Sequence, residues 1–360
     1  MDTSAARNAF CAFRPQLLIP PLSSDFMHRF RATLSRLKRK DEVNDMGSKF
    51  LSWLKSVPKD SQSDGPYESH YEKGQLRAKG IYKDGQPDGP YESYYENGQL
   101  EAKGNFKSGM EDGPWEMFRE NGQSKFKRNY KDGRLHGSQE EFHKNGLLRE
   151  RQAYRDGTKD GPWELFHDNG QLKSRGHYEN GDRKGHFEIF YKNGHLRSRG
   201  SHKNDQRDGS YESYYENGQL ETKGNFRDRK KDGLWEAFHE NGQLEKKGTY
   251  KNDLADGLLE WFHDNGQLNS KGTFKDNKRH GSFEEYRENG RLRIKESYKD
   301  GKQDGPYESY YDNGLLQTTG TFKDGVLDGP YELYQDNGRV KEKGFYKRGV
   351  LQWKKEEGTT

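Results

Sequence analysis

Cysteine is almost absent from this sequence, and so is any long apolar run. The only cysteine is Cys11, which excludes a disulfide within the chain and favours a reducing compartment. No stretch approaches the roughly 18 consecutive apolar residues of a membrane span. The short apolar run 17–19 is flanked by Pro15, Pro20 and Pro21, unlike a secretory signal. We therefore expect a cytoplasmic protein, with a peripheral position at a membrane as the alternative.

Apolar content and net charge are low as well. Hydrophobic residues make up 28% of the chain, and 63 basic residues nearly balance 59 acidic ones for a net charge of +4. This balance gives no support for nucleic-acid binding, which calls for a strongly basic face. The 22 tyrosines and 19 phenylalanines argue against disorder, because disordered segments are poor in aromatic residues. We expect an ordered chain without a deep aliphatic core.

What the sequence does contain is one repeat. An Xaa-Gly step recurs every 24 residues, twelve times without an insertion, and the units read D-G-P-Y-E-x-Y-Y-E-N-G-Q-L-x-x-K-G-x-Y-K-D-G-x-x. The steps begin at Asp64, Asp88, Asp112, His136, Asp160, Lys184, Asp208, Asp232, Asp256, His280, Asp304 and Asp328. A fixed period of this length is typical of proteins whose stacked units complete one another's core.

Two turn signals divide each unit. Asn-Gly, as at Asn97-Gly98, lies in the middle of the unit and predicts a two-residue type I′ hairpin turn, in which both central residues have positive φ. The motif K-D-G-x-x-D-G, as in 83–89, predicts a looser turn into the next unit. The aromatic runs between them have the length of strands, and this much glycine disfavours helix. The predicted fold is all-β: an elongated single antiparallel meander of about 24 strands, made of twelve 24-residue β-hairpins, with a short N-terminal helical segment.

A two-residue Asn-Gly turn also predicts the pairing register. Counting outward, each unit's Glu lies opposite Lys or Arg in eleven units, with Thr319 as the exception, and opposite charges stabilise strand pairs. The same count sets Tyr91 over Gly104, a known device for packing a ring on a cross-strand glycine. In the fourth unit both members of this pair differ: Gln139 replaces the aromatic residue and Gln152 replaces the glycine. A three-residue loop with a bulge is the alternative, and it would shift this register by one.

These residues resemble the MORN-repeat families. The variant MORN repeat is the most similar, with a signature that looks like D-G-x-W-x-x-Y-Y-x-N-G-x-L-x-x-x-G-x-Y-x-x-G, and the resemblance covers 64–351, about four-fifths of the chain. Many bacterial proteins built from the variant repeat are classed with the YwqK-like antitoxins, which are taken to neutralise a partner toxin. Standard MORN proteins are scaffolds at membranes or in protein complexes. The resemblance therefore implies a scaffold, and function must be sought in particular sites.

No unit carries a distinctive catalytic constellation. Because Glu and Lys take the same place in every unit, we interpret them as structural rather than as an acid–base pair. His143, His167, His239 and His263 share one repeat position, but consecutive units lie two strands, about 9.6 Å, apart, too far for shared zinc ligation. We interpret them as surface histidines. We expect no enzyme activity, no cofactor or metal, and no small-molecule substrate.

Positions that vary on the constant pattern are the candidates for binding. The cross-strand pair Ser93/Ala102 of the second unit becomes Met117/Phe126 in the third. These two positions offer the large apolar residues Met117, Phe126, Leu165, Ile189, Trp261 and Ile294. Such residues on a fixed frame are what a partner-binding surface would use. The alternative is that they fill local gaps in an aromatic face.

The two ends depart from the repeat. We divide the chain into a partly disordered N-terminal segment 1–62, the repeats 63–351, and a C-terminal cap and tail 352–360. Segment 26–40 predicts a basic amphipathic helix, with an apolar stripe and a basic remainder; its residues are Phe26, Phe30, Leu34 and Leu37, and Arg29, Arg36, Lys38 and Arg39. This helix would bind an anionic membrane or a partner, or pack over the first hairpin. Residues 48–56 are the expected cap on the open sheet edge.

Two functional hypotheses follow. The first is a non-catalytic scaffold that binds a protein partner, in particular a toxin, through one face of the sheet. The second is a membrane-associated scaffold that binds anionic lipid through the N-terminal basic helix and the repeats.

Overall fold

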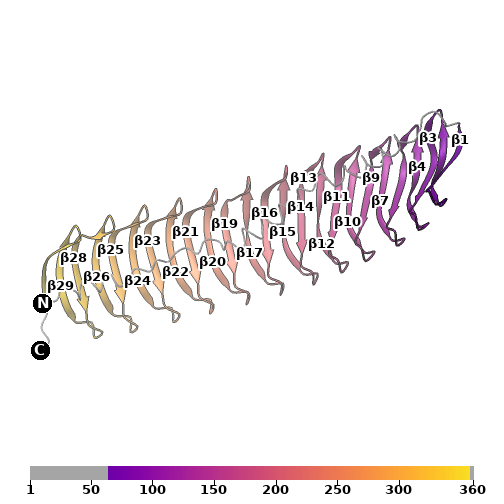
Figure 1. Cartoon of the computed structure of the whole chain (residues 1–360). Helices are drawn as coiled ribbons and strands as arrows, with labels where there is room; N and C mark the ends of the chain where they lie inside the picture. The colour runs from indigo at the N-terminus through magenta and orange to yellow at the C-terminus, as the bar shows by residue number, and fades with distance from the viewer. Residues whose placement is uncertain (1–63, 357–360) are drawn as a thin grey trace. The chain divides into compact units, whose positions relative to one another are not determined.

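The repeats form one long antiparallel sheet. The chain divides into two units, Met1–Ser63 and Asp64–Thr360, and the computed structural model describes residues 64–356. Within this range there are thirty strands and no helix, and no segment is a helix long and apolar enough to cross a membrane. Figure 1 shows the strands following one another side by side in chain order. The predicted all-β antiparallel meander is confirmed.

Twenty-four of the strands are the two arms of the twelve predicted hairpins. The first arms are β1 (Gly65–His70), β3 (Gln86–Tyr94), β6 (Gly113–Phe118), β9 (Gly137–Phe142), β11 (Thr158–Phe166), β14 (Gly185–Phe190), β16 (Gln206–Tyr214), β19 (Gly233–Phe238), β21 (Leu254–Phe262), β23 (Lys278–Tyr286), β25 (Lys302–Tyr310) and β28 (Gly329–Tyr334). The second arms are β2 (Leu76–Lys83), β4 (Leu100–Lys107), β7 (Ser124–Lys131), β10 (Leu148–Arg155), β12 (Leu172–Glu179), β15 (Leu196–Lys203), β17 (Leu220–Arg227), β20 (Leu244–Lys251), β22 (Leu268–Lys275), β24 (Leu292–Lys299), β26 (Leu316–Lys323) and β29 (Val340–Lys347).

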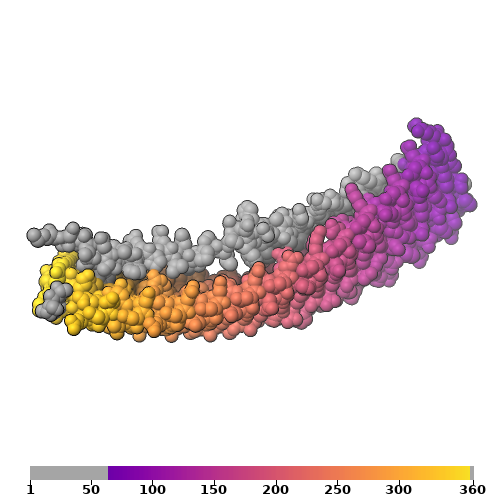
Figure 2. Space-filling view, turned by 90° about the horizontal axis from the view of Figure 1, so that it is seen from below, coloured from indigo at the N-terminus to yellow at the C-terminus, as the bar shows by residue number. Residues whose placement is uncertain are grey.

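The remaining six strands add no new layer. Five have two residues each and precede a first arm: β5 (Met110–Glu111), β8 (Arg134–Leu135), β13 (Asp182–Arg183), β18 (Lys230–Lys231) and β27 (Val326–Leu327). The last strand, β30 (Val350–Glu356), pairs with β29 and places Trp353 opposite Phe345. Figure 2 shows the repeat colours succeeding one another along the sheet, as expected when each unit pairs only with its neighbours.

The mid-unit loop differs from the predicted type I′ turn. The Gly98 amide donates to the carbonyl oxygen of Tyr95 at 2.9 Å, and the Tyr95 amide donates to that of Gln99 at 2.8 Å. Gly98 has φ of 81°, whereas Asn97 is not among the residues with positive φ. This is a three-residue loop, a type I turn closed by a left-handed glycine, and the two-residue prediction was wrong.

A second irregularity restores the predicted register. In β3–β4 the Cα partners are Tyr94↔Leu100 and then Ser93↔Ala102, so Glu101 is an extra residue on one strand. This bulge cancels the one-residue shift of the longer loop. The Glu–Lys pairing and the pairing of Tyr91 with Gly104 are therefore as predicted.

The tight type I′ turn lies at the opposite edge, between units. Asp84 and Gly85 have φ of 51° and 73° and lie between the paired residues Lys83 and Gln86. In the ninth unit the second turn residue, equivalent to Gly85, is Asn277, with φ of 66°. The two turn types are thus exchanged relative to the sequence-based prediction, although both positions are turns as expected.

The two faces of the sheet have different characters. The face that carries Tyr91, Ser93, Ala102 and Gly104, here called the packed face, contains the buried aromatic residues. Rings lie close to glycines of the neighbouring strand: a Cβ atom added to Gly104 would lie 2.2 Å from the Trp115 ring. Trp115 also meets Phe106 edge to face, with centroids 4.9 Å apart. These contacts repeat along the sheet and stabilise neighbouring strands.

The opposite face, here called the ladder face, carries the Glu–Lys/Arg array. In most units the Glu has a basic Cα partner within its own unit and another in the preceding unit, as Glu92 has in Lys103 and Lys79. The Lys79–Glu92 ion pair measures 2.8 Å and the Lys103–Glu116 pair 3.3 Å. The Lys79 ammonium group also lies 5.8 Å from the centre of the Tyr94 ring. The pairing therefore links successive units as well as the arms of one hairpin.

Thr319 interrupts this ladder and offers a simple test. It is the Cα partner of both Glu308 and Glu332. Thr319→Lys should stabilise the last two units by about 0.2–1 kcal/mol, because it adds an opposite charge between two carboxylates. The matched control is Thr318→Lys, since Thr318 is buried on the packed face and a buried lysine destabilises. Thermal melting distinguishes them, and equal effects would contradict the assignment of faces.

The predicted helix 26–40 and the predicted cap 48–56 lie outside the described residues.

Candidate functional site

The six predicted binding residues lie in one line across the packed face. Ser93 and Ala102 continue through Met117 and Phe126, because Ala102 pairs with Met117 in the next unit. We call this line of successive Cα partners the variable row; it runs through Ser69, Ala78, Ser93, Ala102, Met117, Phe126, Glu141, Glu150, Leu165, Ser174, Ile189, Ser198, Ser213, Thr222, Ala237, Lys246, Trp261, Ser270, Glu285, Ile294, Ser309, Thr318, Leu333 and Glu342.

Exposure differs among the six. Phe126 and Ile294 are buried, with 8% and 5% of their surface exposed, while the other four are partly exposed. Trp261 packs against the buried cluster of Ala255, Leu259 and Phe274. The structure thus places Met117 and Phe126 in the third unit, and Leu165 and Ile189 in the fifth and sixth units. Trp261 and Ile294 lie farther along the row.

The fourth unit interrupts the row with a polar block. Gln139 pairs with Gln152, and Glu141 pairs with Glu150, so four neighbouring positions of the packed face carry two amides and two carboxylates. In eight of the other eleven units the first pair is a ring over glycine, and small residues are the most frequent at the second pair. In the variable row the two glutamates lie between Phe126 and Leu165. Sequence reasoning noted the two glutamines but missed the glutamates, because it searched the row only for apolar residues.

Several polar atoms around this block have no hydrogen-bond partner. Gln152 and Gln139 are only 1% and 8% exposed, and the Oε1 atom of each is buried and unpartnered. The Nε atom of Arg128 and the Nε1 atom of Trp163 are likewise buried without a partner. Trp163 is the Cα partner of Gln152. A buried polar atom without a hydrogen-bond partner destabilises a fold. Four such atoms at adjoining positions distinguish the fourth unit and its two neighbours from a regular hairpin pair.

The two carboxylates of the block are not equivalent. Glu141 forms an ion pair with Arg149. Burial raises the pKa of Glu150 above its ordinary value, and the neighbouring Glu141 adds to this, while Lys159 and Arg149 oppose it. The nearby cations therefore do not compensate for the loss of water around Glu150.

Glu150→Gln should consequently stabilise the protein near neutral pH. The substitution removes a like-charge pair between strands, worth about 0.2–1 kcal/mol. A carboxyl group whose pKa is raised in the folded state disfavours folding above that pKa, so the gain should vanish as the pH falls and Glu150 takes up its proton. Glu285→Gln is the control, because Glu285 is another carboxylate of the variable row and is ion-paired with Arg293, but its Cα partner is Ile294 rather than a second carboxylate. Melting curves at pH 7 and pH 4 give the comparison; a gain of equal size for both variants would contradict the prediction.

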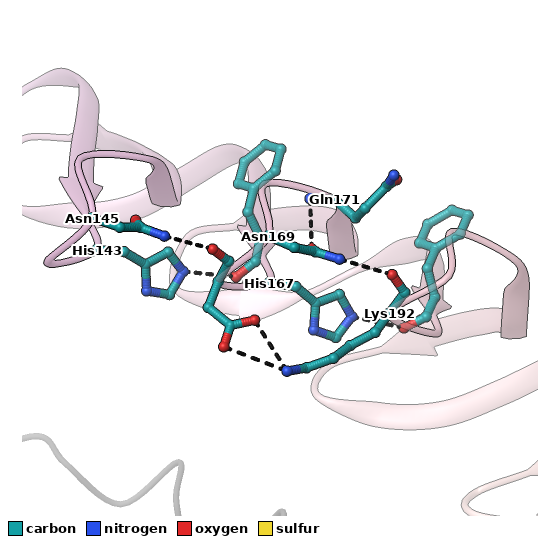
Figure 3. Close-up of polar contacts among 9 residues, drawn as sticks. His143, Asn145, His167, Asn169, Gln171 and Lys192 are labelled. Atoms are coloured by element: carbon teal, nitrogen blue, oxygen red, sulfur yellow. Dashed lines mark hydrogen bonds and ion pairs between the residues drawn. The ribbon is translucent and has the colours of Figure 1, made fainter.

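The shared histidine position joins neighbouring loops. The Nε2 atoms of His143 and His167 donate to the carbonyl oxygens of Phe166 and Phe190, each at 3.2 Å (Figure 3). Asn145 and Asn169 donate in the same way to the next loop, at 2.7 and 3.0 Å. Tyr95 occupies the histidine position in its own unit and donates to the Phe118 carbonyl oxygen. These histidines are partly buried structural residues, and the interpretation of them as surface histidines needs this correction.

The ladder face holds a second set of variable residues, which the sequence analysis missed. Leu234 and Leu258 are 51% and 46% exposed there, at a position that holds proline in several other units, such as Pro90 and Pro114. They are two strands apart, with Thr249 between them. Single exposed apolar residues are ordinary, so they serve below as controls.

Among residues 64–356, no three His, Cys, Asp or Glu side chains are grouped so that they could hold a metal ion. The candidate site consists of apolar and hydrogen-bonding groups: the segment of the variable row from Met117 to Ile189, together with the polar block of the fourth unit.

The fold and this site define an open, single-sheet repeat protein. The family model of the MORN repeat variant matches the chain eleven times, and the chain belongs to this family. The matches cover residues 63–84, 87–108, 111–132, 159–180, 183–204, 207–228, 231–252, 255–276, 279–300, 303–324 and 327–348. The gap falls on the fourth unit, where the polar block lies. A comparison with curated proteins finds no match.

Similar chains occur among solved structures, in the crystal structures of TcdB2-TccC3, TcdB2-TccC3-TEV and TcdB2-TccC3-Cdc42. Their sequence identities are 11%, 10% and 11%, and their TM-scores are 0.18, 0.18 and 0.14. The matches cover 78%, 81% and 79% of this chain but only 17%, 18% and 22% of the other chains. At these TM-scores the likeness carries no argument about function.

Proposed function

We propose that this protein is a non-catalytic scaffold that binds a protein partner through the packed face of its sheet, along the variable row. A toxin is the class of partner that the resemblance to YwqK-like antitoxins suggests. The observation that carries the proposal is the variable row itself. Its residues change in size and charge from unit to unit, while the ring–glycine contacts beside it and the ladder on the opposite face recur in most units.

Serine substitutions in the row provide a test that spares the frame. Ser93, Ser213 and Ser309 already occupy this position in other units, so Leu165→Ser with Ile189→Ser should be tolerated by the sheet. The matched control is Leu234→Ser with Leu258→Ser. It removes two leucines of the ladder face that are more exposed than Leu165 and Ile189. Melting temperatures of both variants should stay near that of the unmodified chain.

The measurement is affinity capture from native lysate with the full chain as bait, followed by quantitative mass spectrometry. We expect a specific protein to be recovered by the unmodified chain and by the ladder-face control, and to be lost with Leu165→Ser and Ile189→Ser. Recovery of no specific protein, or loss only in the control, would contradict the proposal. Purifying the recovered protein and measuring inhibition of its activity then tests the antitoxin role.

The membrane-associated scaffold is the second proposal, favoured by the basic amphipathic sequence 26–40. It requires the full chain to sediment with anionic liposomes, while a chain beginning at residue 63 stays in the supernatant. Neutral liposomes are the control, because anionic lipid attracts basic segments electrostatically. Equal sedimentation of the two chains would exclude this role for the N-terminal segment.

A further inference from the structure

The polar block of the fourth unit has the form of a binding site. Two amide oxygens, of Gln139 and Gln152, are buried without a hydrogen-bond donor. They adjoin the Glu141–Glu150 pair, in which Glu141 has the Arg149 partner. Within residues 64–356 Glu150 forms no ion pair. A missing donor at buried acceptors is costly, so a ligand that supplies several N–H groups would be favoured here.

The flanks of the block indicate what kind of donor fits. In the variable row, Phe126 precedes the two glutamates and Leu165 follows them. These side chains suit the aliphatic stem of a long side chain whose charged head reaches the carboxylate. The guanidinium group of arginine carries five N–H donors in a planar fork, enough for a carboxylate and two amide oxygens together.

The unpartnered donors beside the block point to a peptide rather than a free cation. Trp163 Nε1 and Arg128 Nε need acceptors, and the carbonyl oxygens of a peptide backbone provide them. The Arg128 guanidinium group also lies 4.7 Å from the centre of the Phe126 ring. A basic residue within a polypeptide supplies donors and acceptors at once.

We propose that the fourth unit binds an arginine side chain of the protein partner, through Glu150 and the Oε1 atoms of Gln139 and Gln152, with the stem between Phe126 and Leu165. This inference rests on the proposed function, because it names the chemistry by which the partner is recognised. It also gives the fourth unit, which the family model leaves unmatched, a role as the specific contact in an otherwise regular frame.

The test uses the full chain labelled with ¹⁵N at glutamine side chains and the peptide acetyl-Ala-Arg-Ala-amide. We expect saturable shifts of the Gln139 and Gln152 side-chain amide signals in NMR spectra. The same peptide with citrulline, which has the shape of arginine without its charge, should bind about tenfold more weakly or worse, because a charge-assisted hydrogen bond is lost.

Two protein variants localise the binding. Glu150→Gln should weaken the arginine peptide about tenfold or more. Glu285→Gln changes a carboxylate of the variable row in the tenth unit that is paired with its own arginine, and it should leave binding unchanged. Equal affinity for the citrulline peptide, equal loss in both variants, or no shift of the two glutamine signals up to millimolar peptide would overturn the inference. The peptide assay does not depend on lysate capture. Peptide binding without a captured partner refutes only the proposed function, and a captured partner without peptide binding refutes only the arginine site.

Discussion

Gly224→Val is expected to open the sheet locally around the seventh and eighth units. A Cβ atom at Gly224 would lie 2.3 Å from the Trp235 ring, and that ring is wedged against Phe226 and Tyr211 with centroids 4.9 and 6.2 Å away. Overpacking of this kind costs about 1–3 kcal/mol or more. Because repeat sheets are held by neighbouring units, the loss should appear as faster hydrogen exchange in β16, β17 and β19 rather than throughout.

Gly85→Asn is the matched control, because it alters a glycine with nothing within 4 Å of an added Cβ atom. Asn277 occupies the equivalent turn position with a left-handed backbone, so the change should cost less than about 0.5 kcal/mol. Similar exchange rates for the two variants would show that the ring–glycine contact contributes little.

Acid is expected to destabilise the protein through the ladder. A hydrogen bond from Lys79 holds the pKa of Glu92 below its ordinary value, and hydrogen bonds from Tyr214 and Tyr286 do the same for Glu212 and Glu284. A carboxyl group with a lowered folded-state pKa stabilises the fold above its unfolded-state pKa, and this contribution is lost as the pH falls through the lowered value. The melting temperature should therefore fall by roughly 5 °C or more between pH 6 and pH 3.

The triple variant Glu92→Gln, Glu212→Gln, Glu284→Gln separates the ladder from general acid effects. It should melt at a lower temperature than the unmodified chain at pH 7 and show a smaller decrease on acidification. Added salt should reduce the difference between the two proteins at pH 7, since these pairs are partly exposed and ions screen them. A pH dependence identical to that of the unmodified chain would contradict the ladder's contribution.

Much of the frame could be predicted from sequence because it depends on local spacing. The 24-residue period is read directly from the sequence. The Glu–Lys register and the pairing of Tyr91 with Gly104 agree with a count from a two-residue turn because the bulge at Glu101 cancels the extra residue of the loop. The turn types could not be predicted in this way. Asn97 donates from Nδ2 to the Glu120 carbonyl oxygen in the next unit, while its Oδ1 accepts from the Gln99 amide. The first of these bonds joins residues 23 positions apart, which no local pattern reveals.

The candidate site was predictable only in part for a related reason. Counting from a turn places Met117 opposite Phe126, but the next step, from Phe126 to Glu141, depends on the register between units. That register is set by the type I′ turns, which the sequence analysis assigned to the other edge. Glu141 and Glu150 therefore did not emerge as neighbours of Phe126 and Leu165 until the strands were placed.

The central claim is that the variable row serves recognition while the rest of the unit builds the sheet. Hydrogen–deuterium exchange on the chain carrying Leu165→Ser and Ile189→Ser tests it most directly. We expect protection of backbone amides in β11, β12, β14 and β15 to stay within about twofold of the unmodified chain, while partner capture is lost. A loss of protection by about tenfold or more across these strands would mean that the row packs the sheet, and that its large apolar residues fill gaps rather than bind a partner.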